Sequence, residues 1–64
     1  MDEKVMEDFV LAAMAAAAES AVNAVRRDLG HPYIRTSWAN EALTTAATPQ
    51  AFLAKCVSLM EGDE

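Results

Sequence analysis

Residues 3–29 read EKVMEDFVLAAMAAAAESAVNAVRRDL, and this stretch decides the fold because it contains neither glycine nor proline. Alanine, the best helix former, fills much of it. Acidic residues at its start and two arginines in its last turn suit the helix dipole. Gly30 is typical of a helix C-terminus, and Pro32 cannot continue a helix. The sequence therefore predicts one long helix over about residues 3–29.

The second half of the chain predicts two shorter helices. Residues 31–35 read as an extended connection, after which Thr36 or Ser37 can cap a short helix. Thr48 followed by Pro49 combines a capping residue with proline at the first helical position. No stretch alternates with a period of two, so we predict no strand. The expected fold is all-α, a single small domain over residues 1–64 with helices at about 3–29, 37–46 and 49–61.

The long helix carries two apolar faces. One face is a heptad seam with spacings of four and three residues, made of Leu11, Ala15, Ala18, Val22, Val25 and Leu29. A second seam lies roughly opposite and contains Met6, Phe9, Ala13 and Ala16 before it gives way to polar residues. Two short helices cover only part of a helix that is about 40 Å long. A helix that is apolar nearly all round is buried on both sides.

Small size and two apolar faces together predict a dimer. A chain of 64 residues with few large apolar side chains has a marginal core, and one cysteine allows no internal disulfide. We expect a helical bundle completed by dimerisation, with the long helices of two copies packed about a two-fold axis and antiparallel in preference to parallel. The alternatives are a monomeric three-helix bundle, in which alanine is only a helix former, and an obligate complex with a different protein. The residues expected at the dimer interface are Met6, Phe9, Ala13, Ala16, Leu11, Ala18 and Val22.

The formal net charge of −5 makes the chain acidic, which argues against nucleic acid or an anionic membrane as the main partner. The apolar run from residue 9 to residue 18 has half the length needed to span a bilayer, and acidic residues precede it. A lone free cysteine suits a reducing compartment. We expect a cytoplasmic chain without a membrane segment.

Basic and aromatic residues gather around the first connection. Residues 21–40 carry a net charge of +2, whereas the segments on either side are acidic. This corner fits an acidic protein partner, and the residues expected to contact it are Arg26, Arg27, Tyr33, Arg35 and Trp38. The alternative is a small nucleic-acid-binding transcriptional regulator that uses the patch of Arg26, Arg27 and Arg35.

No set of residues suggests catalysis. His31 and Cys56 are the only histidine and cysteine, and Cys56 lies on an apolar stripe where cysteine is usually a small hydrophobe. The sequence has no phosphate loop and no dinucleotide fingerprint, and it lacks the ligands for a zinc site within one chain. We therefore predict a non-catalytic protein–protein interaction module without cofactor or metal. It would act as an accessory subunit, a neutraliser or an inhibitor of another protein.

Overall fold

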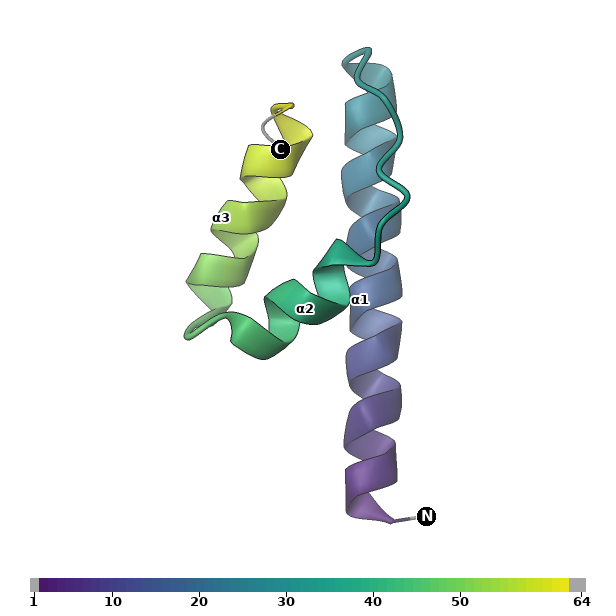
Figure 1. Ribbon diagram of the computed structural model, residues 1–64, viewed down its shortest axis with the longest axis vertical. Coiled ribbons are helices and arrows are strands. Elements are labelled where there is room, and N and C mark those ends of the chain that lie inside the picture. The colour runs from purple at the N-terminus through teal and green to yellow at the C-terminus, as the bar shows by residue number, and fades with distance from the viewer. Residues whose placement is uncertain (1, 63–64) are drawn as a thin grey trace.

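The computed structural model describes residues 2–62 and has three helices and no strand within that range. They are α1 (Glu3–Asp28), α2 (Trp38–Thr45) and α3 (Pro49–Met60). Each end lies within one residue of the predicted end, so the all-helical architecture is confirmed. The molecule is elongated, with extents of 42 × 20 × 14 Å, because α1 is much longer than the body formed by α2 and α3 (Figure 1).

Local capping explains where α1 begins and ends. The carboxylate of Asp2 accepts a hydrogen bond from the backbone N–H of Lys4 at 3.3 Å and thereby caps the N-terminus. At the other end, Gly30 takes a positive φ of 83°. The backbone N–H of His31 then donates to the carbonyl oxygen of Arg26 at 2.8 Å, and that of Gly30 to Arg27 at 3.1 Å. These two bonds form a Schellman motif, as the glycine predicted.

The caps of the two short helices differ from each other. Thr48 caps α3 as predicted, since its hydroxyl oxygen accepts a hydrogen bond from the backbone N–H of Ala51 at 3.1 Å. Ser37 stands at the N-cap position of α2 but makes no capping bond with its side chain. The carboxylate of Glu19 on α1 accepts instead from the backbone N–H of Ala39 at 3.2 Å. A tertiary contact thus replaces the local cap expected from Thr36 or Ser37.

The core lies between the C-terminal half of α1 and the two short helices. Residues 31–37 run back along α1, α2 crosses it near its middle, and α3 returns beside its upper half (Figure 1). Val22, Cys56 and Leu59 are buried at the centre. Around them pack the partly buried side chains of Ala18, Ile34, Trp38, Phe52 and Met60. The first turns of α1 extend beyond this body and are covered by nothing in residues 2–62.

Candidate interaction surface

The projecting first half of α1 exposes large apolar side chains. Phe9 is 73% exposed, and four further side chains in this half are about half exposed, namely Val5, Met6, Val10 and Met14. A single exposed apolar side chain is ordinary, but a contiguous set on one element marks an interaction site. This set is therefore the first feature of the candidate site.

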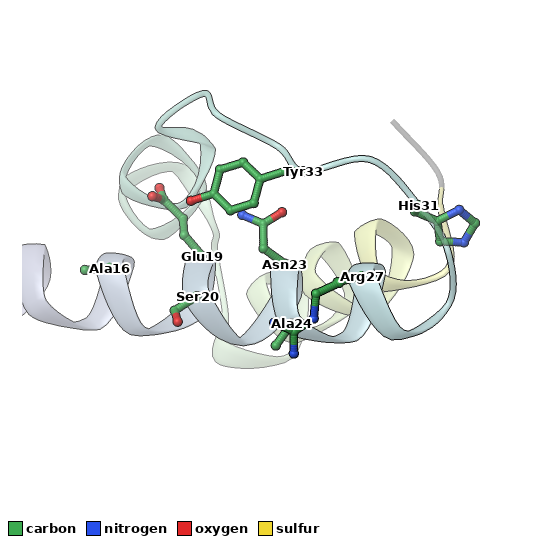
Figure 2. Close-up of a pocket in the computed structure, with 8 residues that line it drawn as sticks. All are labelled: Ala16, Glu19, Ser20, Asn23, Ala24, Arg27, His31 and Tyr33. Carbon is green, nitrogen blue, oxygen red and sulfur yellow. The ribbon is translucent and has the colours of Figure 1, made fainter.

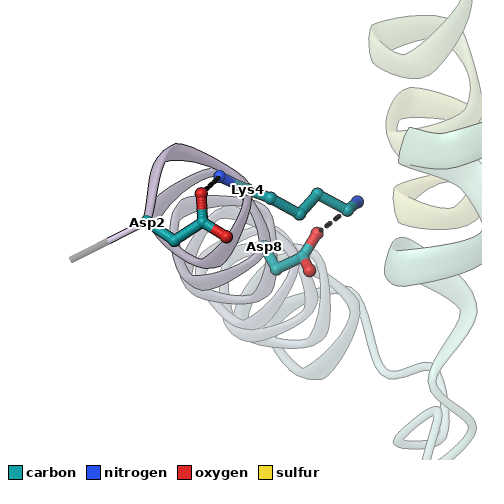
Figure 3. A network of polar contacts seen from close by, with 3 residues as sticks. All are labelled: Asp2, Lys4 and Asp8. Carbon is teal, nitrogen blue, oxygen red and sulfur yellow. Dashed lines mark hydrogen bonds and ion pairs between the residues drawn. The ribbon is translucent and has the colours of Figure 1, made fainter.

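In the first two turns of α1, the side that continues the core face is polar. Lys4 precedes Val22 by 18 residues, which is about five full turns, so the two share one side of α1. Lys4 Nζ forms an ion pair with Asp8 Oδ1 at 3.0 Å on that side (Figure 3). Both side chains are well exposed, and such a pair contributes only a few tenths of a kcal/mol. The apolar surface of the projecting half therefore faces away from the body.

The uncovered apolar face continues along the whole of α1. Its residues follow spacings of four and three, and all are exposed; we call them the outer seam: Met6, Val10, Ala13, Ala17, Ser20 and Ala24. The seam expected from the sequence contained Phe9 and Ala16 in place of Val10 and Ala17. Its continuation would reach Asn23, which is only 6% exposed. The structure thus rotates the free face slightly around the helix.

Three residues expected at the dimer interface lie against the chain's own body. Val22 is fully buried in the core, and Ala18 packs against that core. Leu11 is partly buried on the same side of α1. Side chains already covered within the chain offer no area to a second copy, so we leave these three out of the interface. Met6, Phe9, Ala13 and Ala16 remain exposed.

Arg26 serves inside the fold and not on its surface. Its side chain is only 1% exposed, and its Nε donates to the carbonyl oxygen of Pro32 at 2.9 Å. A second guanidinium nitrogen donates to the carbonyl oxygen of Leu59 at 2.8 Å. Arg26 therefore holds α1 to the segment of residues 31–37 and to the end of α3. The sequence prediction of Arg26 as a partner contact does not fit this burial, and we leave it out of the contact set.

Asn23 holds the connection against α1. Its side-chain amide donates to the carbonyl oxygen of Ile34 at 3.0 Å, and its side-chain oxygen accepts from the backbone N–H of Ile34 at 2.8 Å. The side chain thus pairs with one residue as a strand backbone would. Sequence reasoning assigned no role to Asn23. A polar residue of modest helix propensity inside a long alanine-rich helix was the only available signal.

Beside Asn23, an open pocket lies between α1 and residues 31–33. The ring of Tyr33 lies over α1 next to Glu19 and Asn23, and forms one wall (Figure 2). The remaining lining comes from α1 and from the start of the connection: Ala16, Ser20, Ala24, Arg27 and His31. The pocket borders the outer seam, because Ser20 and Ala24 belong to both. Its lining is mixed, since two alanines and the aromatic ring of Tyr33 lie among polar side chains.

The predicted basic and aromatic corner is thus only partly assembled. Arg27 is exposed and lines the pocket with Tyr33, which is 69% exposed; its Nε lies 3.7 Å from Asp28 Oδ1. Arg35 is exposed on the connection. Trp38 is partly buried and stacks on Phe52, with ring centroids 6.4 Å apart. Its indole N–H is buried without a hydrogen-bond partner among the described residues.

Cys56 and His31, the two side chains that could act as a nucleophile or a base, both pack against other parts of the chain. Cys56 is buried beside Val22 and Leu59, and this burial raises the pKa of its thiol. The imidazole of His31 lies against Gly62, where a Cβ would approach the ring within 2.9 Å. Within residues 2–62, no group of three or more His, Cys, Asp or Glu side chains is placed to hold a metal ion. None of the three helices in this range is long and apolar enough to cross a membrane.

Comparison with known proteins gave no match to a protein-family model, a curated protein or a solved structure.

Proposed function

We propose that this chain is a non-catalytic protein–protein interaction module that acts as a homodimer through the outer face of α1. The observation that carries the proposal is the exposure of five large apolar side chains on the projecting half of α1. Burying apolar surface contributes about 25 cal/mol per Å², so a second helix on this face gains free energy that the isolated chain forgoes. The module would serve as an accessory subunit, neutraliser or inhibitor of another protein.

Residues outside α1 are available for that other protein. Leu53 and Val57 are exposed on the side of α3 that faces away from the core, and Arg35 is exposed on the connection. A homodimer formed along α1 leaves these residues free. The alternative of a nucleic-acid-binding regulator gains no support, because Arg26 is buried and the net charge is −5.

The mass in solution tests this proposal. Light scattering over a range of concentrations should give about twice 6.9 kDa for the natural chain. Phe9→Asp places a charge in the contact and should give a monomer that keeps its helicity by circular dichroism. Leu53→Asp is the matched control, since Leu53 is similarly exposed but lies on α3. A natural chain that stays monomeric, or a Phe9→Asp variant that stays dimeric, contradicts the proposal.

A further inference from the structure

We propose that the second copy packs antiparallel along the outer seam, with Ala15 of one copy level with Ala15 of the other, and that Phe9 enters the pocket walled by Tyr33. This inference rests on the proposed function and specifies its geometry. It draws on three separate features of the structure, which are the sizes of the seam residues, the charges at the two ends of α1, and the position of the pocket.

The outer seam is complementary to itself when two copies run in opposite directions. The bulky residues Met6 and Val10 lie in its first half, and the small residues Ser20 and Ala24 lie in its second half. An antiparallel pair centred at Ala15 forms layers in which large side chains meet small ones. The layers pair Met6 with Ala24, Val10 with Ser20, and Ala13 with Ala17 of the second copy. A parallel pair instead places Met6 on Met6 and Ala24 on Ala24, and the helices would then be held apart at one end.

Charge favours the same arrangement. Glu3 and Arg27 lie three residues beyond the two ends of the outer seam, and both are exposed. The antiparallel register centred at Ala15 brings Glu3 of each copy opposite Arg27 of the other, so that two ion pairs close the ends of the interface. In a parallel pair, Glu3 faces Glu3 and Arg27 faces Arg27, and like charges would repel.

The pocket supplies the third feature. Phe9 flanks the outer seam on the side where Ala16 and Asn23 also lie. In an antiparallel pair these flanking sides face each other, and Phe9 comes level with position 21 of the second copy, within the stretch of α1 from Ala16 to Arg27 that lines the pocket. That is the position of the pocket beneath the Tyr33 ring (Figure 2). Phe9, which is the aromatic residue of α1 and is 73% exposed, is thus brought to a pocket with an aromatic wall, and aromatic rings in contact attract each other.

Disulfide crosslinking tests the register. Val10→Cys and Ser20→Cys variants are unfolded together in urea under reducing conditions, refolded as an equimolar mixture, and oxidised. The mixture should give a mixed disulfide dimer by mass spectrometry, because Val10 faces Ser20 of the second copy. Each variant alone should crosslink little, since a disulfide requires Cα atoms within about 7 Å. The natural chain is the control for Cys56, which is buried. A Val10→Cys variant that crosslinks efficiently to itself overturns the antiparallel register.

Charge reversal gives a second readout. Glu3→Arg alone or Arg27→Glu alone should weaken dimerisation roughly fivefold, because each affects two symmetric pairs at the rim. The double variant should recover the natural dissociation constant, and a double variant weaker than either single variant contradicts the proposal. A natural chain that is monomeric by light scattering overturns the proposed function together with this geometry. A stable dimer with the wrong crosslinks overturns the geometry alone.

Discussion

The two halves of α1 differ in what they expose and bury: the first half leaves large apolar side chains exposed, whereas the second half buries two polar side chains beside Val22. In the first half, Phe9 is 73% exposed and Val10 is 54% exposed. In the second half, Asn23 is 6% exposed and Arg26 is 1% exposed. Hydropathy would assign burial the other way round. The comparison shows that a side chain in this chain is covered where the rest of the fold passes over it, and that polar groups suit that place when they find bonding partners.

The reason lies in what passes over each half. Residues 31–37 run along the second half as extended backbone, whose N–H and carbonyl groups need hydrogen-bond partners when covered. Asn23 and Arg26 supply those partners, and an apolar side chain in either position could not. The first turns of α1 lie beyond α2 and are not covered by the rest of residues 2–62. Their apolar surface is therefore free for association.

The largest expected effect breaks the polar side of this comparison. Arg26→Ala removes the guanidinium that donates to the part-buried carbonyl oxygen of Pro32 and the buried carbonyl oxygen of Leu59, and leaves both without that donor. The expected loss is about 3 kcal/mol of unfolding free energy. Urea denaturation at fixed chain concentration measures it. This loss is a large share of the total unfolding free energy expected of a 64-residue domain.

Arg35→Ala is the control for that experiment, because Arg35 is exposed on the connection. Its expected effect on unfolding free energy lies within about 0.5 kcal/mol. Equal losses for the two variants would mean that burial does not distinguish these arginines, and the comparison would fail.

A second, smaller effect tests the attachment of residues 31–37 to α1 separately from the attachment of α3. Asn23→Ala removes both bonds to the backbone of Ile34, and we expect a loss of about 2 kcal/mol. Asn40→Ala, at an exposed position of α2, is the matched control and should lower the unfolding free energy far less. Hydrogen exchange at the Ile34 amide should accelerate in the first variant only. An unchanged exchange rate would show that other contacts hold the connection in place.

The smallest effect extends the comparison to a titratable group. Burial raises the pKa of the Cys56 thiol, so the fold favours the neutral thiol. The stability from this preference is fully present below the ordinary thiol pKa and is lost as pH rises through the raised value. Unfolding free energy measured across alkaline pH should therefore fall more steeply for the natural chain than for Cys56→Ala. Parallel curves for the two proteins would contradict this assignment.

The helices could be predicted from sequence because their signals are local. Gly30 and Pro49 act through their own backbone geometry, and Thr48 acts through a hydroxyl that caps the helix it precedes. The cap of α2 could not be predicted, because Glu19 reaches it from a different helix. Thr36 and Ser37 are both residue types that cap helices, but the carboxylate of Glu19 takes that role at α2.

The candidate site divides along the same line. Exposure of Phe9 and Met6 was expected from the mismatch between the length of α1 and the size of the body, which composition and helix geometry determine. The burial of Arg26 was not, because cations in a last turn usually remain at the surface. The path of residues 31–37 and the position of the end of α3 together bring two carbonyl oxygens within reach of Arg26. The same path covers Asn23, which the predicted seam would reach next after Ala16.

The position of the lone tryptophan gives this molecule a built-in spectroscopic reporter. Trp38 stacks on Phe52 between α2 and α3, far along the chain from the projecting turns of α1. Its emission should follow the opening of the body and should be insensitive to whether the first turns of α1 are covered. Fluorescence and light scattering recorded on one sample would then follow two separate equilibria. Their midpoints, compared across concentration, would show whether the body can persist after the copies separate.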